Sequence, residues 1–316
     1  MEAAQNDNSI QEEQKVQLLQ QQQQNELQDL EKLNINNGQN SNQELDQNKE
    51  SQNSQMNNSQ AESKPQQKKK KPKQEPPKVV LPSFKILVLH GFQQYYERIE
   101  ERIQPWIKFF SKNYEIRDVL LPVAPNKTLP NDPEDPFRCW LALNRDDPLD
   151  FDGRWVLTEA HYHFYDESEE HLLEVVEKNP DIDIIINFSQ GSLMGSLFYA
   201  KNRDKNIFKS LKMIINICGV GLPKVINENL KFVNDLYEEK EQIEVPTLFL
   251  VGEKDQVVPF DRTQALMKWY KNKQILKFDG PHCIPKQKVY LEQVKKFIDE
   301  TYQAHKEKQN EKEQQN

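Results

Sequence analysis

Apolar residues are distributed unevenly along this chain, and their spacing separates a polar arm from one folded domain. From residue 81 onward, short runs rich in β-branched residues alternate with longer segments in which apolar residues recur every three or four positions. The short runs predict buried strands, and the longer segments predict amphipathic helices. This alternation is typical of a mostly parallel sheet with helices on both faces, so the predicted fold class is α/β.

The predicted elements follow one another closely through the domain. Strands are predicted at residues 84–89, 116–121, 182–186, 213–217, 245–251 and 275–278, and helices at 95–111, 166–178, 192–200, 260–270 and 286–298. Asp166 and Glu169 resemble a capping box at the start of the second helix. Residues 124–165 fit no regular element, and a loop of this length in a compact domain is usually functional or disordered.

Composition places the domain boundaries. Residues 1–60 contain 16 glutamines and 12 asparagines, and no aromatic residue precedes Phe84. Such a segment cannot bury enough apolar area to offset the entropy lost on ordering, so residues 1–80 are predicted to be a disordered arm. Its Gln/Asn bias and spaced leucines permit self-association or contact with a partner protein. Residues 81–302 are the predicted folded domain, and the polar residues 303–316 are predicted to be a disordered tail.

Charge and cysteine usage narrow the partners and the location. The net charge is −8 and the lysine-rich stretch 68–73 has no aromatic neighbours, so nucleic acid is not an expected partner. That stretch is either a solvated linker or a nuclear-import patch. The three cysteines suit a reducing compartment, and no signal-peptide core or membrane-spanning apolar run is present. We expect a cytoplasmic protein, with a nuclear share if the lysine patch directs import.

The strongest chemical signal is the pentapeptide Asn-Phe-Ser-Gln-Gly that runs from Asn187 to Gly191. A serine followed two residues later by glycine, between a strand and a helix, is typical of the nucleophile elbow, which exposes a serine hydroxyl above a sheet. This position makes Ser189 the candidate nucleophile. The chain departs from the motif at the first position, where it has Asn187 in place of glycine.

Two further residues supply the rest of the chemistry, each just after a predicted strand. Asp255 follows the strand at 245–251, and His282 follows the strand at 275–278. A serine hydroxyl needs an imidazole to take its proton, and the imidazole needs a carboxylate to orient it. The order Ser189, Asp255, His282 is that of the α/β-hydrolase triad.

An oxyanion hole is predicted from the loop after the first strand. Residues 90–92, His-Gly-Phe, follow that strand directly. Such a loop aims a backbone N–H at the oxyanion of a tetrahedral intermediate, and the residue after the nucleophile supplies the other N–H. The predicted donors are the backbone amides of Phe92 and Gln190.

Together these segments resemble the FSH family of serine hydrolases, a branch of the α/β-hydrolase superfamily. The matching segments are residues 86–92 with Gln94, 188–192, 252–255 with Val258 and Pro259, 280–282, and the Arg-x-Trp element at 138–140. The resemblance covers about residues 84–302 and implies an α/β-hydrolase fold and an ester substrate with an acyl chain. The chain departs from the family at Asn187 and Pro281, where glycine is usual.

The position of the segment 124–165 resembles that of the insertion that caps the active site in this fold, so we interpret it as a flap that lines the substrate site. Trp140 and Trp155 are therefore predicted to contact the substrate, and the competing interpretation is a packed surface loop anchored by its aromatic residues. The histidines at 161–171 match the spacing of no closed metal site. No phosphate loop or dinucleotide fingerprint occurs, so neither a metal nor a cofactor is predicted.

Two functions stay open from the sequence. The leading hypothesis is a serine hydrolase that cleaves a small-molecule carboxylic ester, or a thioester, through an acyl-enzyme. The alternative is a catalytically weak or inactive hydrolase-fold scaffold protein, motivated by Asn187 and Pro281 at sensitive positions and by the long polar arm. A covalent adduct on Ser189 distinguishes the two.

Overall fold

The structure is a computed structural model. It describes residues 81–315, with gaps at 129–133, 135, 144–158, 161, 222–223, 226–229, 239 and 241. The chain separates into two units, Met1–Glu75 and Pro76–Asn316, and the described residues all belong to the second. The predicted arm and Trp155 therefore lie outside the described residues.

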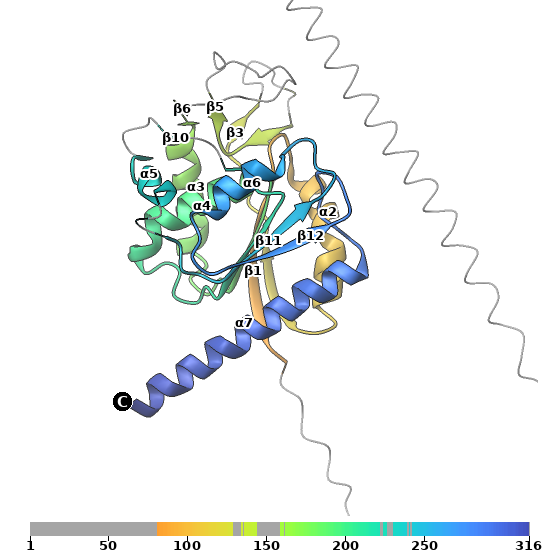
Figure 1. The fold of residues 1–316 in the computed structure, drawn as a ribbon, viewed down its shortest axis with the longest axis vertical. Coiled ribbons are helices and arrows are strands. Elements are labelled where there is room, and N and C mark those ends of the chain that lie inside the picture. Colours follow the sequence, from red (N-terminus) through yellow and green to blue (C-terminus); the bar gives the residue numbers. More distant parts are fainter. Residues whose placement is uncertain are drawn as a thin grey trace, which may run out of the picture. The chain divides into compact units, whose positions relative to one another are not determined.

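Six parallel strands form the centre of the fold (Figure 1). They are β1 Ser83–Leu89, β2 Glu115–Leu120, β8 Ile184–Phe188, β9 Met213–Ile217, β11 Thr247–Gly252 and β12 Lys273–Phe278. Their order across the sheet is β12-β11-β9-β8-β1-β2, and every neighbouring pair is parallel. Each strand was predicted from its apolar run, so the α/β fold class is confirmed.

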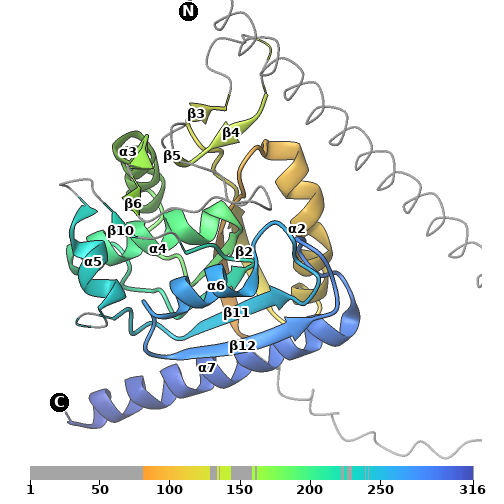
Figure 2. The same ribbon diagram turned by 45° about the horizontal axis from the view of Figure 1, so that its top comes forward.

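Helices cover both faces of this sheet (Figure 2). They are α2 Tyr96–Phe110, α3 Tyr165–Glu177, α4 Gln190–Asn202, α5 Phe232–Tyr237, α6 Phe260–Met267 and α7 Lys288–Gln315, with a 3-10 turn, η1, at Arg203–Lys205. Successive residues of a strand point to opposite faces, and β8 divides the core in this way. Ile186 packs in the cluster that includes α2 and α7, whereas Ile185 packs in the cluster that includes α3 and α4.

The segment after residue 124 contains short paired strands in its described parts. These are β3 Asn126–Lys127 with β4 Arg138–Cys139, β5 Ala142–Leu143 with β7 Tyr162–His163, and β6 Glu159–Ala160 with β10 Lys224–Val225. Two-residue strands offer too few alternating positions for a sequence pattern to reveal them. The prediction of no regular element is corrected accordingly.

The capping box predicted for α3 is wrong. The residue before the helix is Phe164, which has a φ of 66° and makes no side-chain capping bond, so the helix begins one residue earlier than predicted. Asp166 lies inside the first turn, where its charge still favours the positive end of the helix dipole. Glu169 turns toward α4 and forms an ion pair with Lys201 at 2.5 Å.

The predicted disordered tail is also corrected, because α7 continues to Gln315. The residues beyond 302 are mostly glutamine, glutamate, lysine and alanine, which have high helix propensity. Lysine–acid pairs four residues apart, such as Lys295 with Asp299 at 2.6 Å, stabilise the preceding turns. Within the described part of the chain, no helix combines the length and the apolar character that crossing a membrane requires.

Candidate active site

Ser189 lies in a sharp turn between the end of β8 and the start of α4. Its backbone has φ 52° and ψ −120°, a conformation that L-residues rarely adopt and that costs free energy unless the surroundings enforce it. The Ser189 amide donates to the carbonyl of Ile217 on β9, at 2.9 Å, and the Ser189 carbonyl accepts from the Ser192 amide, at 2.9 Å. These two bonds hold the serine in the geometry of a nucleophile elbow.

Gly191 lets the helix come close to the first strand. A Cβ atom at this position would lie 2.7 Å from the carbonyl oxygen of His90, which no real side chain tolerates. The same packing brings the loop after β1 to the nucleophile, because a Cβ on Gly91 would lie 3.1 Å from Cβ of Ser189. Glycine is therefore required where the elbow and the loop after β1 meet.

The structure brings together the three residues predicted to form a triad. The Oγ atom of Ser189 lies 2.9 Å from Nε2 of His282, and Nδ1 of His282 lies 2.7 Å from Oδ2 of Asp255. The Ser189 side chain reaches the surface only slightly, with 8% of the residue exposed. Both contacts are within hydrogen-bond range, so the serine, imidazole and carboxylate form one continuous chain.

Asp255 is held as an anion. Its Oδ1 atom accepts hydrogen bonds from the amides of Val257, at 2.9 Å, and Val258, at 2.8 Å. Burial acts to raise the pKa of Asp255, but the hydrogen bond and charge of His282, together with the Val258 amide and the Cys218 thiol, outweigh it and lower the pKa. A charged carboxylate beside Nδ1 keeps the proton on that nitrogen and leaves Nε2 free to accept from the serine.

Phe188 supports the base from the side. Its ring centroid lies 5.1 Å from that of the His282 imidazole. The guanidinium of Arg102 lies over the Phe188 ring, 5.7 Å from its centroid. Phe188 is itself fully buried. The imidazole therefore rests against a fixed aromatic surface on the α2 side of the sheet.

His90 fixes the loop that precedes Phe92. Its Nε2 atom accepts from the Ala124 amide at 2.9 Å, so Nδ1 carries the proton and donates to the Gly91 carbonyl at 2.7 Å. Burial lowers the pKa of His90 to about 4 and outweighs the opposing effect of its bond to Gly91. A neutral His90 therefore ties the Gly91 backbone to the start of the segment 124–165.

The two predicted oxyanion donors lie beside the nucleophile. Phe92 follows Gly91 in the loop that touches Ser189. Gln190 is the first residue of α4, where a backbone N–H has no acceptor within the helix. The free position of the Gln190 amide suits the predicted role, and both donors remain predictions.

The side chain of Gln190 has a second role that sequence reasoning missed. Its Oε1 atom accepts from the Trp140 amide at 2.8 Å and from the Leu141 amide at 3.4 Å, and its Nε2 donates to the Leu141 carbonyl at 2.9 Å. The residue after the nucleophile thus anchors the chain at 140–141. No spacing or composition signal could reveal a pairing between residues this far apart.

Trp140 does not lie where the sequence led us to expect it. The residue is fully buried, and its indole N–H donates to the His90 carbonyl at 2.9 Å. The ring packs against that of His90, with centroids 5.0 Å apart and the planes tilted by 36°. Trp140 thus packs against the loop after β1, and its side chain has no exposed surface that could contact a substrate. This agrees with the competing interpretation, in which the aromatic residues anchor a packed surface loop.

One group of potential metal ligands occurs among the described residues, and it coincides with the triad. Ligand atoms of Cys218, Asp255 and His282 lie within 4.8 Å of one another. Burial raises the pKa of the Cys218 thiol well above its usual range, so the thiolate that a metal requires is disfavoured. A protonated Cys218 thiol is better suited to donate a hydrogen bond to the Asp255 carboxylate than to bind a metal ion.

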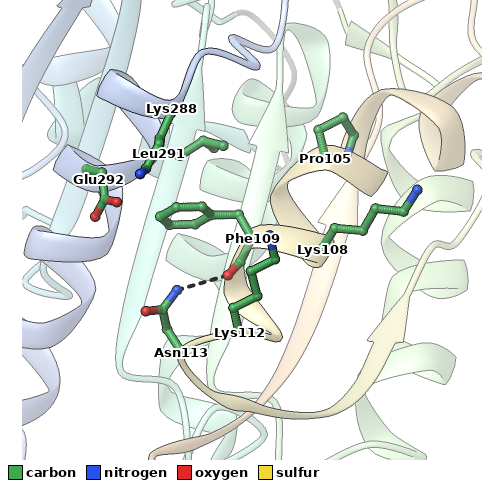
Figure 3. Close-up of a pocket in the computed structure, with 8 residues that line it drawn as sticks. All are labelled: Pro105, Lys108, Phe109, Lys112, Asn113, Lys288, Leu291 and Glu292. Atoms are coloured by element: carbon green, nitrogen blue, oxygen red, sulfur yellow. Dashed lines mark hydrogen bonds between the residues drawn. The ribbon is translucent and has the colours of Figure 1, made fainter. Parts of the chain in front are cut away.

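A separate hollow opens between α2 and α7 (Figure 3). It has a volume of about 570 Å³ and is lined by Pro105, Lys108, Phe109, Lys112, Asn113, Lys288, Leu291 and Glu292. None of these residues belongs to the triad or to the loop after β1. The hollow is therefore distinct from the site around Ser189.

Comparison with known proteins identifies the family. Residues 80–294 match the family described as Serine hydrolase (FSH1), and the chain belongs to that family, as the motifs predicted. It is similar to an esterase of Aedes aegypti, with 27% identity over 232 residues, 72% of this chain and 79% of that protein. It is also similar to Family of serine hydrolases 3 of Saccharomyces cerevisiae, with 27% identity over 234 residues, 68% of this chain and 83% of that protein.

A solved structure of acyl-protein thioesterase 2 from Zea mays aligns with 72% of this chain and 96% of its own. The sequence identity is 18% and the TM-score is 0.46.

Proposed function

We propose that this serine hydrolase cleaves carboxylic esters through an acyl-enzyme formed on Ser189. The observation that carries the proposal is the hydrogen-bond chain from Ser189 Oγ through both nitrogens of His282 to Asp255. Membership of the family supports a small-molecule ester as the substrate. Acyl transfer is the chemistry that this set of residues performs on several unrelated folds.

In the first half-reaction, Ser189 Oγ attacks the ester carbonyl carbon while Nε2 of His282 takes the hydroxyl proton. The carbonyl oxygen becomes an oxyanion that accepts hydrogen bonds from the amides of Phe92 and Gln190. The imidazolium, stabilised by Asp255, then donates its proton to the alcohol oxygen as the carbon–oxygen bond breaks. The alcohol leaves, and the acyl group remains on Ser189.

In the second half-reaction, a water molecule takes the place of the alcohol. His282 removes a proton from this water as its oxygen attacks the acyl carbonyl, and the same two amides hold the second oxyanion. The proton then returns to Ser189 Oγ as the acyl–serine bond breaks. The products are a carboxylic acid and the free enzyme.

A fluorophosphonate probe tests the proposal directly. We expect rapid labelling of the wild type and loss of labelling in Ser189→Ala and His282→Ala. Ser111→Ala is the matched control, because Ser111 is an exposed serine at the end of α2, and it should label like the wild type. If the folded wild type is not labelled, the serine is not activated, and the scaffold function becomes the better explanation.

The leaving group is tested with matched substrates. An oxygen ester and a thioester that share one acyl chain differ only in the atom that His282 must protonate. We propose the oxygen ester as the preferred substrate, because a triad with a well-placed acid assists an alkoxide more than a thiolate, which departs without full protonation. A higher kcat/KM for the thioester at equal acyl chain would reverse the assignment.

A further inference from the structure

The side chain of Asn187, at the departure from the elbow motif, packs against a glycine of α4, Gly195. Asn187 occupies the first position of the elbow and is fully buried at the end of β8. A Cβ atom on Gly195, one and a half turns into α4, would lie 2.6 Å from Oδ1 and 2.8 Å from Nδ2 of Asn187. The elbow motif has glycine at the strand position, where this chain has Asn187. The room for the Asn187 side chain therefore comes from Gly195 on the facing helix.

Asn187 also begins a buried hydrogen-bond chain. Its Nδ2 donates to Oδ1 of Asn216 at 2.9 Å, and the two residues are directly opposite each other on β8 and β9. Nδ2 of Asn216 donates in turn to the hydroxyl oxygen of Tyr270 at 3.3 Å. All three residues are fully buried, so these bonds are formed without competition from bulk water.

The chain continues from Tyr270 to the helix that carries the nucleophile. Ser196 Oγ donates to the Ser192 carbonyl, so it accepts the hydroxyl proton of Tyr270 in their contact of 2.5 Å. The Ser192 amide donates to the Ser189 carbonyl. Buried polar groups therefore connect the strand just before Ser189 with the helix just after it.

Stability alone does not account for an asparagine here. The Oδ1 atom of Asn187 is buried and has no hydrogen-bond partner among the described residues. A buried amide oxygen without a donor lowers stability, and native proteins keep few of them. The arrangement is better explained by its position, since Asn187 is two residues from the nucleophile.

We propose that Asn187 is a positioning residue for Ser189, and that Asn187 and Gly195 are a reciprocal pair in which one must be small when the other is large. Asn187 acts through Asn216, Tyr270 and Ser196 to fix the approach of α4 to β8, and with it the direction of the Ser189 hydroxyl. This inference rests on the hydrolase activity proposed above.

A double-mutant cycle tests the pair. Asn187→Gly leaves a void and removes the donor to Asn216, and Gly195→Ala places a methyl group against the Asn187 amide. We expect each to lower kcat and the rate of fluorophosphonate labelling roughly tenfold with little change in KM, the size expected for coupled contacting residues. The double variant should recover only part of the lost rate, because the methyl group fills the void while the hydrogen bond to Asn216 stays lost.

Two additional variants separate positioning from general loss of stability. Ile185→Val removes a methylene from β8, the strand that carries Asn187, and from the core cluster that contains Tyr270. It should therefore lower the melting temperature but leave the labelling rate unchanged. Tyr270→Phe removes only a hydroxyl from the chain, so it folds even if Asn187→Gly does not, and it should slow labelling about two- to fivefold.

The outcomes are distinct. If the wild type is labelled and Tyr270→Phe is labelled at the same rate, the positioning role is overturned while the hydrolase activity stands. The same holds if the double variant is labelled no faster than the slower of the two single variants. Unlabelled wild type overturns the proposed activity itself.

Discussion

The turn that carries Ser189 and the segment that begins near residue 124 are held in place by different kinds of contact. Backbone bonds to neighbouring elements hold Ser189, whose amide donates to Ile217 on β9. Side chains hold residues 140–141 of the segment: Gln190 binds the backbone there, and the Trp140 indole binds the His90 carbonyl.

This difference separates the residues proposed for the reaction at Ser189 from the residues that hold the neighbouring segment in place. A turn held by backbone bonds keeps its backbone conformation whenever the sheet forms. Residues 140–141 depend in addition on a few side-chain bonds, so a single substitution can shift them. Changes at the triad should therefore remove the reaction, whereas changes at the anchors should alter how substrates reach it.

The largest effect is expected from Asp255→Asn. The amide cannot accept the Nδ1 proton as an anion does, so His282 loses its orientation and the stabilisation of its charged form. By analogy with other triads, kcat should fall about 10³- to 10⁴-fold while the fold is retained. Steady-state ester hydrolysis and circular dichroism measure the two quantities. Asp261→Asn, an exposed change in the first turn of α6, is the control and should be silent.

The next largest effect is a pH dependence of stability that we expect from His90. This residue binds both the Ala124 amide and the Gly91 carbonyl, and so links the segment that begins near residue 124 to the loop beside Ser189. Its pKa is lowered from 6.5 to about 4 by burial, so in the folded protein it stays neutral where the unfolded chain is protonated. Its contribution to stability is complete above pH 6.5 and is lost as the pH falls toward 4. The loss amounts to roughly 3 kcal/mol in the free energy of unfolding.

Urea unfolding at pH 7, 5.5 and 4.5 measures this dependence. His90→Gln keeps an acceptor and a donor but does not titrate, so its stability should change less over the same range. Parallel curves for the two proteins would show that another group causes the acid loss.

A smaller effect is expected from Gln190→Ala. The change leaves the backbone amide in place but removes the three side-chain bonds to Trp140 and Leu141. We expect kcat/KM to fall about tenfold, equivalent to losing one or two buried hydrogen bonds, and labelling by a small probe to fall less. Gln293→Ala on the exposed side of α7 is the control. An equal loss with both reagents would place the defect in the oxyanion hole.

The parallel sheet could be predicted because its four central strands are nearly continuous apolar runs. All five residues of β8 and of β9 are buried, and each strand has a single polar residue, Asn187 or Asn216. The meeting of Ser189, Asp255 and His282 could be predicted because each lies just after a strand, and the carboxyl ends of parallel strands lie at one edge of the sheet.

The surroundings of the triad could not be read in the same way. Cys218 beside Asp255, and the Gln190 side chain beside Trp140, are contacts across many residues that no periodicity encodes. Burial of Trp140 was misjudged because an aromatic residue in an irregular segment is equally consistent with a substrate wall and a packing anchor. Trp155 stays a prediction, since it lies outside the described residues.

The smallest effect is expected at the end of α7, where the sequence predicted disorder and the structure has helix. Residues from 306 to 314 are exposed, so deleting 307–316 removes almost no packing. Stability should change by less than about 0.5 kcal/mol and activity should be unchanged, as for exposed positions in general. The far-ultraviolet circular dichroism should nevertheless lose the signal of the deleted helical residues. An unchanged spectrum would mean that this end is not helical in solution, because a solvated helix end without tertiary contacts depends on propensity and charge pairs alone.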